Sequence, residues 1–173
     1  MPQALIRHER PDDLREVHEV NRLAFDRPGG AVEADLVDAL RRNGRVLISL
    51  VAELDGRVVG HALFCPITIE SPGSTATAIA LGTLAVHPDN QRRGVGSQLV
   101  EAGIEACRQL GHRSIFVLGH RTYYPRFGFV PARPFGIIYD DGRDSFQVVE
   151  LTEGALSGLR GTVRYPPEYE QFS

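Results

Sequence analysis

The stretch that decides the fold is LGTLAVHPDNQRRGVGSQLV, residues 81–100. An apolar run ends at Val86, a loop follows, and a glycine-rich segment then enters a helical pattern. The first turn of a helix offers about four backbone N–H groups and the positive end of the helix dipole. Gly94 and Gly96 remove side chains where a ligand would approach the backbone, and residues 91–93 (QRR) add donors and positive charge. This junction predicts an anion site suited to a phosphate or pyrophosphate.

The flanking sequence predicts a mixed order of strands and helices. Apolar runs rich in β-branched residues indicate strands over residues 4–8, 46–54, 57–69, 76–86, 114–118, 129–133 and 145–151. Helical spacing indicates helices over residues 11–25, 31–42, 97–110 and 122–127. Asp55-Gly56 predicts a tight hairpin, and Asp13 with Glu16 three residues later indicates a helix cap. The last stretch, RYPPEYEQFS, is expected to be an extended arm.

Composition restricts the class of protein. A chain of 173 residues predicts a single domain over 1–173, with about 152–173 as a C-terminal extension. All 19 basic side chains are arginine, which excludes a lysine Schiff base and the phosphate-binding lysine of a P-loop. The net charge of −3 gives no reason to expect nucleic acid as a partner. Without an apolar membrane span or the apolar core of a signal peptide, the expected location is the cytoplasm.

The sequence supports neither a dinucleotide-binding site nor a metal site. A dinucleotide fingerprint needs a third glycine at position 99, where Leu99 stands. The histidines have no ligand spacing, so we expect no metal. Cys65 and Cys107 are too few for a disulfide framework, and both are expected in the core.

Residues 84–99, LAVHPDNQRRGVGSQL, resemble the signature of the GNAT superfamily of acetyl-CoA-dependent N-acetyltransferases. The family pattern is a strand ending V-x-P, followed by Q/R-x-x-G-x-G/A at the start of a helix. Here it is met by Val86, Pro88, Gln91, Gly94 and Gly96. A second segment, TYYPRFGF over residues 122–129, is similar to the family's short helix with a tyrosine four residues before Gly-Phe.

The resemblance implies a three-layer αβα fold of the α/β class. Its mixed, mostly antiparallel sheet would have about seven strands and be splayed at its centre. It further implies that the backbone binds acetyl-CoA as co-substrate, with the N–H of Val86 polarising the thioester carbonyl. The cofactor-binding residues would be Leu84, Ala85, Val86, Gln91, Arg92, Arg93, Gly94, Val95, Gly96 and Ser97. Many relatives carry an asparagine at the end of the fifth strand, where this chain has Gly119-His120.

The implied reaction is direct attack of a primary amine on the acetyl thioester. By the resemblance, Tyr124 is the general acid that reprotonates the CoA thiolate, with Tyr123 as the alternative. Candidates for the base are His120 and Glu33, and water could relay the proton instead. The alternative function is an acyl-CoA-binding regulatory module without turnover.

The acceptor, a small molecule or a peptide, stays open. It could be attracted by acidic side chains if it is a cationic amine, and these are Glu33, Asp35, Asp140, Asp141 and Asp144. Dimers are common in such folds, so a homodimer is compatible with the sequence.

Overall fold

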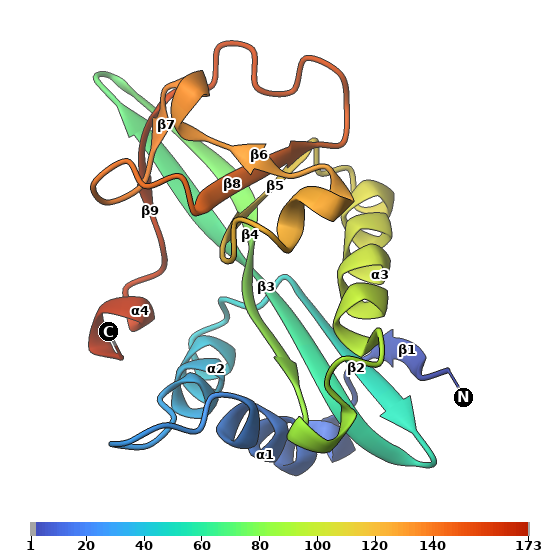
Figure 1. The fold of residues 1–173 in the computed structure, drawn as a ribbon. Helices are drawn as coiled ribbons and strands as arrows, with labels where there is room; N and C mark the ends of the chain where they lie inside the picture. Colours follow the sequence, from blue (N-terminus) through green and yellow to red (C-terminus); the bar gives the residue numbers. More distant parts are fainter. Residues whose placement is uncertain (1–2, 173) are drawn as a thin grey trace. The chain divides into compact units, whose positions relative to one another are not determined.

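The computed structural model describes residues 3–172, which divide into two compact units. Among the described residues, unit 1 comprises 3–64, 83–103 and 167–172, and unit 2 comprises 65–82 and 104–166. Strand β3 (Arg57–Ser71), strand β4 (Ser74–Val86) and helix α3 (Val95–Gln109) each contribute residues to both units (Figure 1).

Unit 1 combines three antiparallel strands with a pair of helices. β1 (Leu5–His8) pairs with β2 (Ile48–Leu54), which pairs with the first half of β3. The β2–β3 turn has Asp55 and Gly56 both at positive φ, 52° and 77°, which is the backbone of the predicted tight hairpin. Helices α1 (Leu14–Ala24) and α2 (Glu33–Arg42) pack against each other (Figure 1).

The predicted cap of α1 is wrong in its chemistry. Asp13 does not cap the helix; its carboxylate accepts hydrogen bonds from Arg7 at 2.7 and 2.9 Å and from the Arg10 N–H at 2.6 Å. Glu16 instead accepts from the Val58 N–H at 3.0 Å. Both carboxylates therefore join the helix region to other segments, since a partly buried arginine or a strand N–H competes with the helix end for them.

Unit 2 contains the parallel crossover. β4 and β5 (Ser114–Leu118) pair in parallel over Ile79–Leu81 and Ile115–Val117. This pairing involves only part of β4, which continues to Val86. β8 (Phe146–Glu150) pairs antiparallel with β5 on one side and with β6 (Val130–Pro131) on the other. An apolar core centred on Phe116 and Phe146 fills this unit.

The whole sheet is mixed and mostly antiparallel, as predicted, and its main strand order is β1-β2-β3-β4-β5-β8-β6. Two strands were not predicted, β7 (Ile137–Ile138) and β9 (Gly161–Arg164), which pair with each other in parallel. β9 also pairs with Thr68–Glu70 of β3, and α4 (Glu168–Gln171) ends the described chain. The prediction of an extended arm over RYPPEYEQFS is therefore wrong in its described part, because Arg164 belongs to β9 and Glu168–Gln171 form a helix.

Short 3₁₀ helices complete the described chain: η1 (Pro11–Asp13), η2 (Pro88–Asn90), η3 (Tyr124–Phe127) and η4 (Arg133–Phe135). Among the helices of residues 3–172, none has the length and apolar character that a membrane crossing requires.

Candidate active site

In unit 1, the junction between β4 and α3 carries the predicted anion-binding segment. Helix α3 starts at Val95, two residues before the predicted start, so Gly96 lies in its first turn. The first bond of the helix ladder runs from the Gln98 N–H to the Gly94 carbonyl at 3.0 Å. The N–H groups of Val95 and Gly96 therefore precede the ladder, and they lie where a helix binds anions.

The loop that leads into α3 has an unusual backbone. Arg92 and Gly94 both adopt positive φ, 62° and 84°, and both are exposed. A Cβ atom placed on Gly94 would have nothing within 4 Å, so solvent or a ligand can reach the backbone there. A non-glycine residue held at positive φ costs about 1–3 kcal/mol, and such strain is concentrated at functional sites.

The same loop is fastened to the end of β4. Gln91 donates from Nε2 to the Val86 carbonyl at 3.0 Å, and the His87 N–H donates to the Val59 carbonyl at 2.8 Å. His87 Nδ1 in turn accepts from the Asp89 N–H at 3.1 Å. The structure thus brings the predicted residues 84–86 and 91–97 together around one strand end.

Two glycines let α3 approach β3 within unit 1. A Cβ atom on Gly60 would lie 2.9 Å from Leu99 and 3.0 Å from Val95, and one on Gly103 would lie 2.3 Å from the Phe64 ring. Side chains at either position would push the helix away from the strand. The direction of the first turn of α3 therefore depends on these two small residues.

In unit 2, Tyr124 lies at the start of η3 and is 7% exposed. Its ring makes edge contacts with Tyr123 and Phe129, with centroids 5.1 and 5.7 Å apart. Burial, with a smaller contribution from Tyr123, raises the pKa of Tyr124 well above its usual value. The phenol is therefore protonated at neutral pH, as a proton donor must be.

The two candidates for the base differ in their surroundings. His120 follows β5, is exposed, and its carbonyl accepts from the N–H groups of Tyr123 and Tyr124 at 3.2 and 3.4 Å. Glu33 begins α2 in unit 1; its Oε1 accepts from Arg27 at 2.8 Å, whereas its Oε2 is buried with no protein partner.

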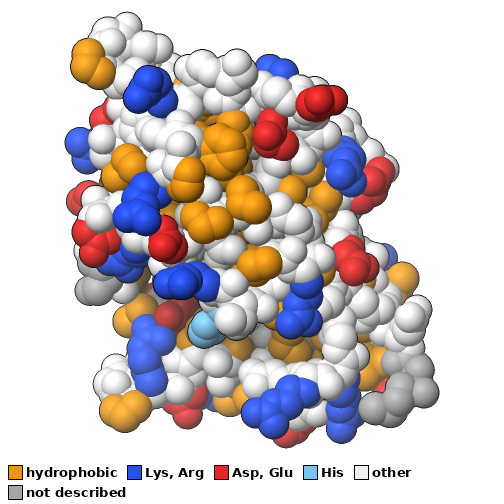
Figure 2. Space-filling model, turned by 45° about the horizontal axis from the view of Figure 1, so that its top comes forward, with side chains coloured by type: hydrophobic (Ala, Val, Ile, Leu, Met, Phe, Trp, Pro, Cys, Tyr) orange, Lys and Arg blue, Asp and Glu red, His pale blue; other side chains and the backbone are white. Residues whose placement is uncertain are grey.

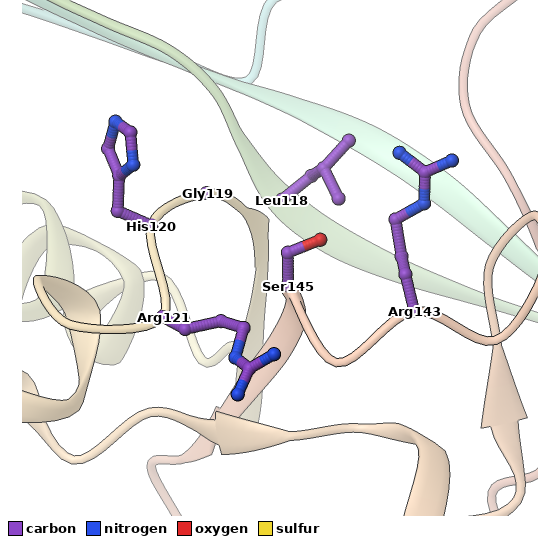
Figure 3. Close-up of a pocket in the computed structure, with 6 residues that line it drawn as sticks. All are labelled: Leu118, Gly119, His120, Arg121, Arg143 and Ser145. Carbon is purple, nitrogen blue, oxygen red and sulfur yellow. The ribbon is translucent and has the colours of Figure 1, made fainter.

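A hollow of about 390 Å³ opens beside the end of β5, lined by Leu118, Gly119, His120, Arg121, Arg143 and Ser145. Figure 3 shows that the His120 ring and the Arg121 side chain leave the loop in different directions. On the face in Figure 2, arginine and acidic side chains alternate among apolar ones.

Sequence reasoning missed two groups of residues. Gln147 of β8, 1% exposed, donates from Nε2 to the carbonyls of Gly119, His120 and Ser145, and no motif marks it. In unit 1, ligand atoms of His18, Asp35 and Asp38 lie within 4.8 Å of one another, although the three are scattered in sequence.

Two members of this second group, His18 and Asp38, already have partners in the protein. Asp38 meets the imidazole of His18 at 2.9 Å and Arg41 at 3.5 Å. The expectation of no metal stays a prediction.

The prediction that both cysteines lie in the core is confirmed. Cys65 and Cys107 are 0% exposed. Burial raises the pKa of the Cys107 thiol to about 12.

Comparison with known proteins agrees with this geometry. Residues 5–132 match the family model described as Acetyltransferase (GNAT) domain. The chain is 31% identical over 171 residues to the uncharacterized N-acetyltransferase YhbS of Escherichia coli K12, covering 97% of this chain and 99% of YhbS. It is 42% identical over 121 residues to the uncharacterized N-acetyltransferase YjhQ of the same strain. That match covers 69% of this chain and only 65% of YjhQ, so the chain spans less than two thirds of that relative.

Two crystal structures share the fold over nearly the whole chain. YhbS of Escherichia coli in complex with CoA has a TM-score of 0.90, and the match covers 100% of this chain and 95% of YhbS at 31% identity. A GNAT family acetyltransferase from Brucella melitensis in complex with acetyl-CoA has a TM-score of 0.78 at 34% identity, covering 96% and 97% of the two chains. The chain therefore belongs to the GNAT family of N-acetyltransferases and is an acyltransferase.

Proposed function

We propose that this protein transfers the acetyl group of acetyl-CoA directly to a primary amine, and that residues 1–173 act as one transferase domain. The observation that carries the proposal is the junction between β4 and α3. An exposed loop with Arg92 and Gly94 at positive φ leads there into the first turn of α3, which starts at Val95. The two similar crystal structures contain CoA and acetyl-CoA, which supports the same co-substrate here.

The proposed roles follow from the chemistry of the thioester. The N–H groups of residues 91–97 bind the pyrophosphate, supported by the charges of Arg92 and Arg93. The pantetheine arm pairs with Leu84–Val86, and the Val86 N–H donates to the thioester oxygen as negative charge develops on it.

The reaction is balanced by two proton transfers. The neutral amine attacks the carbonyl carbon, the C–S bond breaks, and the thiolate sulfur takes the proton of the Tyr124 hydroxyl. The amide nitrogen loses its extra proton to a base. We assign this base to Glu33, because its buried Oε2 has no protein partner, whereas His120 is exposed.

The raised pKa of Tyr124 does not oppose this role. Removal from water disfavours every anion, so the same desolvation that raises the phenol pKa also raises that of the leaving thiol. What matters for the transfer is the difference between the two groups, which is about 1.5 pKa units for the unperturbed pair.

Binding of CoA is tested with two matched glycine variants. Gly94 and Gly111 have φ of 84° and 85°, and a Cβ on either would meet nothing within 4 Å, so alanine at each has the same folding cost. We expect Gly94→Ala to raise the Kd for CoA about 10- to 100-fold, the loss of one or two charge-assisted hydrogen bonds, and Gly111→Ala to leave it unchanged. Calorimetry that detects no CoA binding to the wild type overturns the proposal.

Turnover is tested by thiol release with a panel of amines: a polyamine, an aminoglycoside, a lysine-containing peptide and a peptide with a free N-terminus. With a good acceptor, we expect Tyr124→Phe to lower kcat about 10²- to 10⁴-fold and to leave CoA binding intact. Binding of CoA without turnover on any amine would favour the regulatory module. An unchanged kcat in Tyr124→Phe would refute the acid role alone.

A further inference from the structure

We propose that Gln147 and Gly119 are positioning residues for Tyr124. The buried Gln147 amide fixes the carbonyls from which the η3 turn starts, and the absent side chain of Gly119 leaves the space that the Tyr124 ring fills. This inference rests on the proposed function for its catalytic consequence. Its structural part concerns unit 2 alone.

The side-chain NH₂ group of Gln147 faces three hydrogen-bond acceptors. It lies on β8, between β5 and β6, and is 1% exposed. Its Nε2 lies 3.2 Å from the Gly119 carbonyl, 3.4 Å from that of His120 and 3.4 Å from that of Ser145. Three carbonyl oxygens also fix which end of the amide points at them, since the amide oxygen there would meet only acceptors. The residue is therefore selected for its NH₂ group and not only for its volume.

The His120 carbonyl joins this amide to Tyr124. The same oxygen accepts from the N–H groups of Tyr123 at 3.2 Å and Tyr124 at 3.4 Å, which are the first bonds of the turn. The Gly119 N–H also donates to the Ser145 carbonyl at 3.0 Å. Two hydrogen bonds thus separate the Gln147 side chain from the Tyr124 backbone, and a shift of the loop moves the tyrosine with it.

Gly119 fixes the ring itself. A Cβ atom at this position would lie 2.3 Å from Cε2 and 2.9 Å from Cδ2 of Tyr124, well inside van der Waals contact. Its φ is not in the left-handed region, so space, and not backbone conformation, requires glycine here. A side chain at position 119 therefore cannot coexist with this position of the Tyr124 ring.

The test uses three variants and one matched control. Gln147→Met keeps the length of the side chain without a donor, Gln147→Glu places an acceptor against the three carbonyls, and Gly119→Ala displaces the ring directly. Val148→Ala is the control, because Val148 is 0% exposed and lies in the apolar core, so it loses stability without touching the loop. If the Gln147 variants do not fold, Gly119→Ala carries the same test.

The first readout needs no acceptor. In protein labelled with ¹³C at tyrosine Cζ, the Tyr124 signal is assigned by its loss in Tyr124→Phe and followed as pH rises. In the wild type and in Val148→Ala, we expect this signal not to titrate up to pH of about 11, one unit above a free phenol. In Gln147→Met and Gly119→Ala it should titrate near the ordinary phenol value of about 10, because the ring reaches solvent. Unchanged titration in both variants would overturn the proposal.

The second readout is the division between kcat and KM with any amine that the wild type acetylates. We expect Gln147→Met, Gln147→Glu and Gly119→Ala to lower kcat about 10- to 100-fold, as a misplaced catalytic group does, and to leave the KM for acetyl-CoA unchanged. The control should change neither constant. If Tyr124→Phe keeps full kcat, the acid role fails, whereas the titration still decides whether these residues position the ring.

Discussion

Replacing His61 with glutamine should remove a defined part of the acid sensitivity of this protein. His61 lies on β3 and is fully buried. Asn21 Nδ2 lies 3.0 Å from Nδ1, and Ser49 Oγ lies 2.9 Å from Nε2. Because the amide NH₂ can only donate, Nδ1 accepts and the ring proton sits on Nε2. Burial, with a smaller contribution from Arg41, lowers the pKa of His61 to about 3, so the native ring is neutral.

The size of the effect follows from proton linkage. The pKa of His61 in the unfolded chain is about 6.5. Below that pH the unfolded state therefore binds a proton on His61 that the native state does not bind. The stabilising contribution is complete above that value and is lost as the pH falls towards the native pKa. With a native pKa of about 3, the loss is about 2 kcal/mol between pH 7 and pH 5 and approaches about 5 kcal/mol at the acid limit.

Urea unfolding at pH 7 and pH 5 measures this loss, followed by far-ultraviolet circular dichroism because the chain has no tryptophan. Glutamine at position 61 can accept from Asn21 and donate to Ser49 without titrating. The wild type should therefore lose about 2 kcal/mol more than His61→Gln over this interval. Glu9, whose Oε1 lies 4.0 Å from Nε2, and its partner Arg41 are present in both proteins. Equal losses in the two proteins would refute the reasoning.

Three further outcomes follow from packing and burial. Gly103→Ala should not raise Tm, because overpacking against the Phe64 ring costs about 1–3 kcal/mol and cancels or exceeds the gain of about 1 kcal/mol that alanine brings to a helix. A Tm above that of the wild type in thermal unfolding would contradict the contact. Cys65 and Cys107 are both 0% exposed, so Ellman's reagent should find no reactive thiol in native protein and two in urea. Glu168→Ala should lower the free energy of unfolding by about 1–3 kcal/mol, since the carboxylate is 3% exposed and accepts from Asn43 at 3.0 Å and Arg45 at 3.2 Å. A urea midpoint equal to that of the wild type would show that these two contacts add no stability.

Local patterns account for the parts of the fold that the sequence predicts well. The β5 strand has the predicted bounds, and α3 begins two residues and ends one residue from its prediction. Asp55-Gly56 forms the expected turn because both residues tolerate positive φ. In each case the deciding interaction lies within a few residues along the chain, where periodicity and turn chemistry are informative.

Features decided by distant partners escaped the same reasoning. Gln147 has no periodic or motif signature, and its importance comes from three carbonyls that only the folded chain brings to it. β9 was not predicted, because its strand partners lie far away in the sequence, at residues 68–70 and 137–138. Asp13 has the sequence context of a cap, yet Arg7, six residues away, binds its carboxylate more strongly than a helix end does.

The acidic side chains that could attract a cationic acceptor show the same limit, because their partners are visible only in the folded chain. Asp140 and Asp141 both pair with Arg143, Asp144 lies 3.2 Å from Arg133, and Glu33 lies 2.8 Å from Arg27. A carboxylate with a guanidinium counter-charge exerts little field beyond the Debye length, which is about 8 Å at physiological ionic strength. The attraction of a cationic amine by these four carboxylates is therefore weaker than their number suggests, since three arginines offset most of their charge. We therefore expect selection of the acceptor to depend mainly on short contacts, of the kind that the buried Oε2 of Glu33 can make.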